Sequence, residues 1–480
     1  MKTLHYSLIC VLLLTCCTIY EKTIVKITPP PTKNIKVLPF VEILGETNAV
    51  IIWQVKNVEN SFLEFKEEGE EIKIIPAVSS NELFRADVQK LEPNTIYYYR
   101  IAGTKSEFSK FKTLSKDKKK FSFAVLGDNR TNPKEFKSVA DAVAQHNVDF
   151  IIHTGDMMTD GKWKYQWYKQ WFTPGKAMFK NAPVLIAVGN HEYPWLEKSF
   201  WNYFYPDHSQ FYNKGYYSYQ NGNIFFIHLN PFQPFEPGSK QYLWLENTLK
   251  NCNLPFIVVA LHLSAFTGAA HAKDEAVKSA RQVLVPLFQK YNVNFVVSGH
   301  DHVYDRSEYD GTTYVIAGGA GAPLYNPRAY LNPFSVCAKQ SLNFMICDAD
   351  GEKIKVNVYD NKGNVLDTFS IPPRKIPKTF PAAYATFRPP WSNKVQSTDF
   401  DVYIRHFLSN ELSGTVKTEI STDFEVLPTN CFNFVITTND ILKTLNFKLK
   451  LIDKKQSSYP VKVNVLLPGI TNNMNFLLIY

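Results

Sequence analysis

The stretch Asn294–His302, NFVVSGHDH, places two histidines on either side of an aspartate, directly after an apolar run. A short run of this kind predicts a strand that is buried on both faces. His300 and His302 therefore stand where the strand is expected to end. One His-x-His pair occurs by chance in long chains, so it indicates a metal site only if other strands end in ligand-type residues as well.

Six further apolar runs lie in the middle of the chain. They read FSFAVLGD, VDFIIHTGD, PVLIAVGNHE, NIFFIHLN, PFIVVALH and TYVIAGGAG. Two of the stretches between them, KEFKSVADAVAQHN and AVKSARQVLVPLFQKYN, space their apolar residues as amphipathic helices do. Strands that alternate with helices indicate an α/β domain or a layered α/β/β/α domain, and we expect it to span residues 121–371.

Several of the predicted strands end in a residue of metal-ligand type. These residues are Asp128, Asp156, Asn190, His262 and the pair His300 and His302. Sites in open α/β sheets form beyond the carboxyl ends of the strands, so residues far apart in sequence can meet there. Carboxylate, amide and imidazole groups suit Zn, Mn or Fe, whereas a structural zinc would draw on thiolates. Six donors exceed the needs of one catalytic ion, which indicates two ions that share a carboxylate.

The chain on either side of this domain is predicted to be all-β. Short strands separated by turn signals fill residues 33–115, which favours a small β-sandwich. Within it, LEPNTIYYYR resembles a corner of fibronectin type III domains. A proline-dense stretch, residues 372–391, is expected to be a linker, and the alternating pattern of residues 392–480 predicts a second β-sandwich. The expected fold class is thus a central α/β domain flanked by two all-β sandwiches.

The first residues, MKTLHYSLICVLLLTCC, carry a lysine and then an apolar run. The run is much shorter than the ~20 residues that span a bilayer, so residues 1–20 are expected to be an export signal. LLLTCC resembles a bacterial lipoprotein cleavage box with Cys16 or Cys17 acylated, and ordinary cleavage with secretion is the alternative. We therefore expect a periplasmic, cell-surface or outer-membrane lipoprotein in a bacterium, and a secreted protein otherwise.

The net charge of +9 is spread along the chain, and its one compact basic run is Lys116–Lys120. Because this run lacks interleaved stacking aromatics, it predicts a solvated loop and no nucleic-acid partner. The later cysteines are widely spaced and require no disulfide.

Five ordered blocks resemble the calcineurin-like metallophosphoesterase superfamily, and more closely its purple acid phosphatase-like branch. The blocks are GDNR (Gly127–Arg130), GDMMT (Gly155–Thr159), GNHE (Gly189–Glu192), VALH (Val259–His262) and GHDH (Gly299–His302). A fibronectin-like module before the core is the arrangement of that branch. The resemblance implies an α/β/β/α metallophosphoesterase sandwich with two divalent or trivalent ions, either Fe, Zn or Mn.

The resemblance also implies a role for each matching residue. Asp156 would bridge both ions, Asp128 and His302 would bind the first ion, and Asn190, His262 and His300 would bind the second. His191 would protonate the leaving oxygen or hold the substrate. His271, nine residues after His262, would contact the substrate, unless it is a solvent-facing histidine at a helix start.

Two positions depart from the family's pattern. Arg130 stands where many members have a ligating histidine and purple members have glycine, and Thr159 stands where purple members have a ligating tyrosine. The first ion therefore lacks a usual ligand. Arg130 would clamp a phosphate through its planar fork, or pair with a nearby carboxylate. The remaining acids, Asp301, Asp305 and Glu308, are expected to have no metal role, and most of them are expected to be loop residues.

The function implied by the resemblance is hydrolysis of phosphomonoesters by attack of a metal-bound hydroxide, with a phosphate ester as the substrate. A phosphodiesterase on the same core is one alternative. A non-catalytic surface protein that binds through its β modules is another. Membrane contact is expected only through an N-terminal lipid anchor, and the sequence does not specify an oligomeric state.

Overall fold

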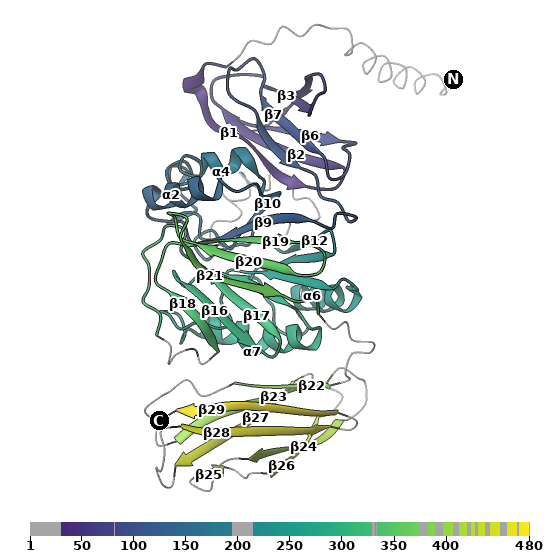
Figure 1. Ribbon diagram of the computed structural model, residues 1–480, viewed down its shortest axis with the longest axis vertical. Helices are drawn as coiled ribbons and strands as arrows, with labels where there is room; N and C mark the ends of the chain where they lie inside the picture. Colours follow the sequence, from purple (N-terminus) through teal and green to yellow (C-terminus); the bar gives the residue numbers. More distant parts are fainter. Residues whose placement is uncertain are drawn as a thin grey trace, which may run out of the picture.

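The computed structural model describes residues 30–80, 82–193, 215–328, 332 and 334–374, together with eight strands after residue 382. Figure 1 shows the strands in three groups that follow one another along the chain. The expected export signal, residues 1–20, lies outside the described residues. None of the described helices is both long and apolar enough to cross a membrane.

The N-terminal region is a β-sandwich of two antiparallel sheets, β1-β2-β6-β5 and β4-β3-β7-β8, preceded by the 3₁₀ turn η1 (Thr32–Asn34). Its strands are β1 (Ile35–Leu44), β2 (Asn48–Val55), β3 (Phe62–Glu67), β4 (Lys73–Pro76), β5 (Val78–Ser80), β6 (Leu83–Gln89), β7 (Ile96–Ile101) and β8 (Ser109–Lys112). Side chains of β7 alternate between the core and the surface, as a half-buried strand requires. The Tyr97 hydroxyl accepts a hydrogen bond from the Glu92 amide at 2.9 Å, which is the geometry of a tyrosine corner.

The central domain contains two sheets. The six-stranded sheet has the order β11 (Val184–Ile186), β10 (Phe150–His153), β9 (Phe121–Leu126), β19 (Phe344–Ala349), β20 (Ile354–Tyr359) and β21 (Val365–Ile371). The seven-stranded sheet has the order β12 (Tyr217–Asn221), β13 (Ile224–His228), β14 (Phe256–Ala260), β15 (Phe295–Ser298), β17 (Thr312–Ala317), β16 (Tyr304–Tyr309) and β18 (Ser335–Lys339). Strands β9, β10 and β11 are parallel to one another, and so are β13, β14, β15 and β17.

Helices cover the outer faces of both sheets. They are α2 (Pro133–Val143), α3 (Lys164–Gln166), the π-helical turn η2 (Trp167–Phe172), α4 (Lys176–Asn181), α6 (Lys240–Asn251) and α7 (Glu275–Lys290). Phe136 of α2 packs in one cluster with Leu126 of β9, and Leu284 of α7 packs with Val296 of β15. Between the sheets, the rings of Phe123 and Phe226 meet edge to face at 5.3 Å. The predicted α/β/β/α layering is therefore confirmed.

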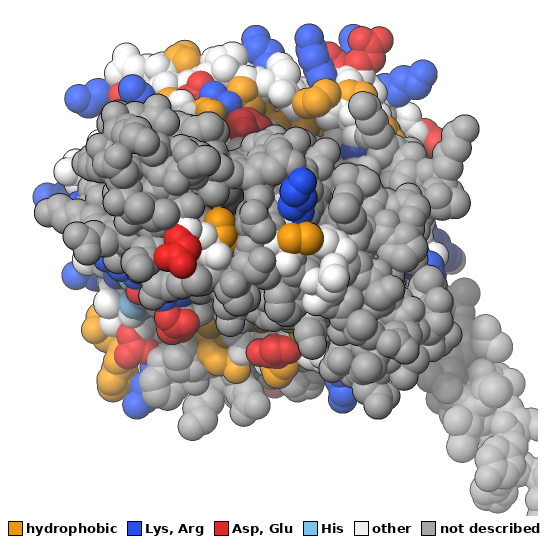
Figure 2. All heavy atoms as spheres, turned by 90° about the horizontal axis from the view of Figure 1, so that it is seen from below, with side chains coloured by type: hydrophobic (Ala, Val, Ile, Leu, Met, Phe, Trp, Pro, Cys, Tyr) orange, Lys and Arg blue, Asp and Glu red, His pale blue; other side chains and the backbone are white. Residues whose placement is uncertain are grey.

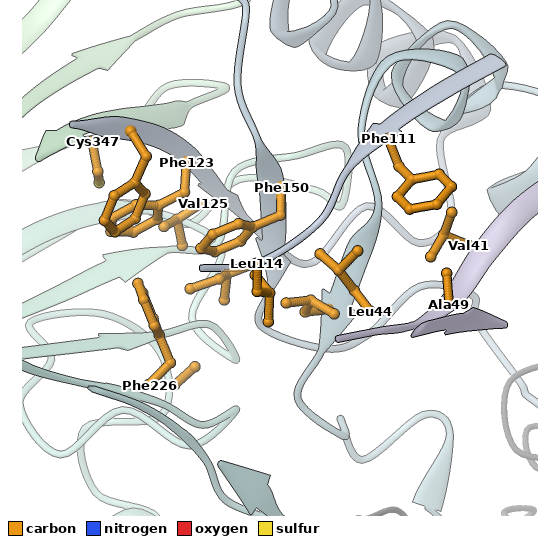
Figure 3. Close-up of a cluster of buried hydrophobic side chains, with 14 of the residues drawn as sticks. Val41, Leu44, Ala49, Phe111, Leu114, Phe123, Val125, Phe150, Phe226 and Cys347 are labelled. Atoms are coloured by element: carbon orange, nitrogen blue, oxygen red, sulfur yellow. The ribbon is translucent and has the colours of Figure 1, made fainter. Parts of the chain in front are cut away.

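The sandwich and the central domain share one hydrophobic core. Figure 3 shows the side chains that connect them, among them Leu44, Phe111 and Leu114 on one side and Phe123, Phe150 and Phe226 on the other. Polar contacts cross the same boundary. The Tyr168 hydroxyl donates to Gln54 at 2.6 Å, and the Ser115 amide donates to Asn221 at 2.9 Å. The N-terminal sandwich and the central domain therefore have separate sheets but one continuous hydrophobic core.

The C-terminal region has two antiparallel sheets, with the orders β22-β23-β27-β25 and β26-β24-β28-β29. The strands are β22 (Ala383–Arg388), β23 (Ser397–His406), β24 (Leu412–Glu419), β25 (Phe424–Leu427), β26 (Cys431–Ile436), β27 (Leu442–Leu451), β28 (Ser458–Leu467) and β29 (Ile470–Ile479). This agrees with the predicted all-β class of the region. The stretch expected to be a linker differs in two places. Strand β22 lies within it, and Arg374 is buried against the central domain, where it donates to the carbonyl oxygens of Cys252, Leu254 and Tyr291.

Charged side chains are mixed on the visible surface. Figure 2 views the molecule from below, and the described side chains around its edge intersperse basic, acidic and apolar groups. Within the basic run, Lys118 is not a freely solvated group, because its ammonium lies 3.0 Å from the Asp149 carboxylate. Among the described residues, Cys252, Cys337, Cys347 and Cys431 form no disulfide.

Candidate metal centre

Ligand-type residues follow the carboxyl ends of five parallel strands in the two sheets. Asp128 follows β9, Asp156 follows β10, Asn190 follows β11, His262 follows β14, and His300 and His302 follow β15. Because parallel strands end at the same edge of a sheet, these residues can converge there. Donor atoms of Asp128, Asp156 and His262 all lie within 4.8 Å of one another, and all three residues are buried.

The backbone at three of these positions is left-handed, with φ of 59° at Asp128, 61° at Asp156 and 71° at His300. Such values are uncommon outside glycine and cost of order 1–3 kcal/mol each, so the surrounding packing must hold them in place. The preceding glycines permit that packing. A Cβ on Gly299 would lie 2.2 Å from Asp128 Oδ2, and one on Gly189 would lie 2.3 Å from Asp156 Oδ1. The Gly-Asp, Gly-Asn and Gly-His pairs of the sequence thus have a steric reason.

One half of the site is centred on Asn190. Its Oδ1 lies 3.0 Å from His262 Nε2 and 3.1 Å from His300 Nδ1. Asp156 Oδ1 is 3.4 Å from the same His262 nitrogen. His262 Nδ1 is 2.8 Å from the Thr154 carbonyl, so it carries the proton and donates it, which leaves the Nε2 lone pair facing the site. These four side chains form one compact donor group.

The other half of the site brings His302 close to the Asp128 carboxylate. His302 Nε2 is 3.8 Å from Asp128 Oδ1, while Nδ1 donates to the Pro323 carbonyl at 2.8 Å. The ring of Tyr325 stacks on His302 with centroids 4.3 Å apart. This fixes both the tautomer and the plane of the imidazole, with the Nε2 lone pair on the side of Arg130 and Asp128.

Arg130 also belongs to this half. Its Nε donates to Asp156 Oδ2 at 3.2 Å, and its Nη2 lies 3.2 Å from His302 Nε2. The structure therefore places Arg130 in a carboxylate pair, one of the two expected alternatives. The carboxylate is the central one of the site and not one at its rim. Thr159 donates its amide and hydroxyl protons to Gln170.

Burial controls the protonation of the site. It lowers the pKa of His262, lowers that of His300 to about 2 and lowers that of His302 to about 4, where the nearby Arg130 charge contributes as well. These imidazoles are neutral near pH 7, as metal ligation requires. Burial and the charge of Asp156 raise the pKa of Asp128. Burial also acts to raise the pKa of Asp156, but electrostatic interactions with His262, His191 and Arg130 outweigh this effect and lower it.

Two further histidines lie beside the predicted ligands. His191 donates its amide proton to Asp156 Oδ1 at 3.1 Å, its Nδ1 contacts the Thr159 carbonyl, and its Nε2 is 3.6 Å from Asp156 Oδ2. The ring of His271 lies 4.1 Å from that of His300, and its Nδ1 is 2.6 Å from Asp274, the residue that precedes α7. His271 is therefore both near a helix start and in contact with the site.

Sequence reasoning assigned no role to Glu192 or Gln170. Glu192 is fully buried and accepts the amide protons of Asp156, Met157 and Gly189, so it joins the loops that carry two of the ligands. Burial, followed by the charge of Asp156, raises its pKa to about 8. The signal for Glu192 was its place in the GNHE block. Gln170, on η2, has no comparable signal in the sequence.

The expectation that the remaining acids are loop residues is wrong for two of them. Asp305 and Glu308 lie on strand β16, which pairs with β17 and β18. Asp305 accepts the Gly268 amide and the Ser335 hydroxyl, and Asp301 accepts the Thr267 hydroxyl and the His271 amide. These buried carboxylates hold the loop that carries His271.

The residues at this edge fit a pair of metal ions. They offer carboxylates, an amide oxygen and neutral imidazoles, the lone pairs of His262 and His302 face the site, and Asp156 lies between the two halves. Two α/β sheets with such a donor set at the ends of their parallel strands define a metallophosphoesterase fold. The comparison with protein families agrees, since residues 121–304 match the family model described as calcineurin-like phosphoesterase. The central domain of this chain is thus similar to that family, and this likeness implies a dinuclear metal centre.

Among individual proteins, the central domain is similar in sequence to purple acid phosphatases. Probable purple acid phosphatase 20 of Arabidopsis thaliana is 31% identical over 260 residues, which cover 48% of this chain and 58% of the relative. Probable inactive purple acid phosphatase 9 of the same plant is 23% identical over 314 residues, which cover 51% of this chain and 48% of the relative. This chain thus spans about half the length of the curated relatives it matches.

A solved structure shares the fold. It is purple acid phosphatase PPD1, isolated from yellow lupin (Lupinus luteus) seeds, with a TM-score of 0.58 and 18% sequence identity. The match covers 70% of this chain and 74% of that chain. At this identity the likeness concerns the fold alone.

Proposed function

We propose that this chain is an exported, metal-dependent phosphoesterase that hydrolyses phosphomonoesters. One observation carries the proposal. Six donors of the types that bind catalytic Zn, Mn or Fe follow five strands and face one another at one edge of the sheets. When bound, two metal ions at this edge would neutralise the charge of a phosphate ester and activate a water molecule for attack.

Side chains of this protein would donate the proton to the leaving group and contact the substrate. His191 is positioned to donate a proton from Nε2, because its Nδ1 is held by the Thr159 carbonyl and its Nε2 lies 3.6 Å from Asp156 Oδ2 on a partly exposed side chain. His271, held by Asp274 and packed on His300, would contact the substrate at the rim.

One feature favours a second candidate function, a non-catalytic binding protein. Arg130 and Thr159 occupy the two places where family members supply a further ligand to the first ion. In addition, one of the relatives carries the name of a probable inactive enzyme. The retained ligands and His191 are the reason to rank hydrolysis first.

The direct test is hydrolysis of p-nitrophenyl phosphate by protein that lacks residues 1–20. Asp156→Asn removes the negative charge between the two halves of the site and keeps the side chain's shape. We expect activity to fall at least about a hundredfold and bound metal, measured by mass spectrometry, to fall with it. Asp87→Asn, the same substitution on the N-terminal sandwich, is the matched control and should change neither quantity.

The same assay separates the alternatives. Equal rates for the wild-type protein and Asp156→Asn would rule out hydrolysis at this site and leave the binding protein. Faster turnover of bis-p-nitrophenyl phosphate than of the monoester would assign a phosphodiesterase.

A further inference from the structure

Arg130 occupies donor atoms that the first metal position needs. The Nε–H of Arg130 is 3.2 Å from Asp156 Oδ2, and its Nη2–H is 3.2 Å from His302 Nε2. Because His302 Nδ1 donates to the Pro323 carbonyl, Nε2 has one lone pair, and this lone pair faces the guanidinium. The same lone pair cannot serve a metal ion and Arg130 at once.

The rest of the loop holds Arg130 in this place. Its amide donates to the Asp156 carbonyl at 3.2 Å, and Nη1 reaches the Thr131 hydroxyl at 3.4 Å. Gln170 Oε1 accepts the amides of both Thr131 and Thr159, so the loops after β9 and β10 are tied together. The side chain of Arg130 is only 17% exposed, which limits screening of its charge by water.

The two halves of the site differ in how closely Arg130 contacts their donor atoms. Asn190, His262 and His300 face one another, and the side-chain hydrogen bonds of Arg130 within the described residues go to Asp156, Thr131 and His302, although its charge also lowers the pKa of His262. A divalent ion in the other half would have to displace a guanidinium from two of its donors and would be repelled by that charge while it remains near.

We propose that Arg130 makes the two metal positions unequal, because its guanidinium competes with the first ion for Asp156 and His302. The second position, formed by Asp156, Asn190, His262 and His300, fills at low metal concentration. The first position fills only when the guanidinium moves away from these donors. The displaced guanidinium stays tethered beside the site and can then receive a substrate phosphate in bidentate fashion. This inference rests on the dinuclear centre of the proposed function.

Titration of the metal-free protein with Mn²⁺, followed by calorimetry and equilibrium dialysis, tests the proposal. The wild-type protein should bind two ions in two separate steps. Arg130→Gln should lower the dissociation constant of the weaker step by at least about tenfold, the size expected from one charge-assisted hydrogen bond. The tighter step should change by less than about threefold. Arg130→Lys keeps the charge but cannot contact Asp156 and His302 at the same time through a planar fork. Its dissociation constant for the weaker step should therefore lie between those of the wild-type protein and Arg130→Gln.

Arg85→Gln, which removes an arginine from a strand of the N-terminal sandwich, is the control for net charge and should leave both steps unchanged. Two equal steps in the wild-type protein would overturn the proposal, whether or not the variants fold. So would a weaker step that is unchanged or weakened further in a folded Arg130→Gln variant. Unchanged metal steps with a raised KM for p-nitrophenyl phosphate would make Arg130 a phosphate clamp alone.

These measurements distinguish a failure of this inference from a failure of the proposed hydrolysis. The protein could bind two ions with unequal dissociation constants, which become more similar in Arg130→Gln, and yet hydrolyse no phosphate ester. In that case the inference stands and the proposed hydrolysis fails. If p-nitrophenyl phosphate is hydrolysed but the two metal-binding steps are equal, the proposed hydrolysis stands and the inference about Arg130 fails.

Discussion

His228, at the end of β13, is a buried imidazole outside the group of predicted ligands. Its side chain is fully buried, and its ring stacks on that of Tyr217 with centroids 4.5 Å apart. Burial lowers the pKa of His228 to about 3, against about 6.5 in an unfolded chain. The unfolded state therefore binds more protons between these two values. The stability that neutral His228 contributes is complete above pH ~6.5 and is lost as the pH falls towards ~3.

Replacing His228 with phenylalanine should remove this acid sensitivity. Phenylalanine keeps the ring stack and has similar volume, so we expect the free energy of unfolding at pH 7 to change by about 1 kcal/mol or less. At pH 4.5 the variant should be more stable than the wild-type protein by up to about 2–3 kcal/mol, since each pH unit below 6.5 costs the wild-type protein about 1.4 kcal/mol.

Denaturant unfolding at both pH values measures this difference. His153, whose pKa burial also lowers to about 3, is unchanged in the variant, so part of the acid sensitivity should remain. Identical pH dependence of the two proteins would show that His228 does not titrate in this range.

Some residues of the site could be predicted because each carries a local signature. Asp128 and Asp156 follow glycine after an apolar run, and close packing explains that pairing, because a Cβ on Gly127 would lie 1.9 Å from Thr154 Oγ1 and one on Gly155 would lie 2.7 Å from the Gly189 amide nitrogen. Glu192 lies in the GNHE block, but the block does not reveal its role, and Tyr325 has no local signature. Their roles come from contacts made across the fold, where Glu192 accepts three amide protons and Tyr325 stacks on a histidine 23 positions earlier in the chain.

At the scale of elements, the turn after β11 is packed so closely that Gly189 has no room for a side chain. A Cβ there would lie 2.4 Å from the Asp156 amide nitrogen and 2.7 Å from Glu192 Oε2. Both obstacles belong to groups that hold the loops after β10 and β11 in register. The turn therefore sets the distance between Asn190 and Asp156.

Gly189→Ala should push these two loops apart. Because the clash involves backbone, we expect the affinity for Mn²⁺ to fall at least about tenfold while the far-ultraviolet circular dichroism stays native. Gly238→Ala is the matched control. It has a left-handed φ of 89° and open space around it, so it should cost stability without any change in metal affinity. A native affinity in Gly189→Ala would mean that the turn can relax.

The strands that carry the ligands were easier to predict than β16. Central strands such as β9 and β14 read as continuous apolar runs because both of their faces are covered. In β16, Tyr304–Tyr309, charged residues interrupt the pattern, and Asp305 is buried only because groups from other segments satisfy its carboxylate. Those partners are distant in sequence, so local pattern alone indicated a loop.

At the scale of the whole molecule, the sandwich and the central domain should unfold together. Leu114 lies in the apolar core that joins them and is 4% exposed. Leu114→Ala should cost about 2–5 kcal/mol, the range for a buried leucine. Because the core is continuous, we expect amide exchange to accelerate equally in β2 of the sandwich and in β9 of the central domain.

Hydrogen exchange followed by mass spectrometry reports both regions in one experiment. Leu249→Ala, in the cluster around α6 on the outer face of the second sheet, tests whether the coupling extends across the central domain. Faster exchange in the sandwich alone for Leu114→Ala would show two separate folding units.

The shared core also bears on how such a chain could be recombined. A cut between residues 115 and 121 would separate the N-terminal sandwich from the central domain and would expose the apolar residues that they share. We therefore expect neither fragment to fold stably when it is transferred alone to another protein. At the other end, Arg374 fastens the chain to three carbonyl groups of the central domain. For gene fusion or domain exchange, we therefore expect the smallest unit that could be transferred to contain at least residues 30–374.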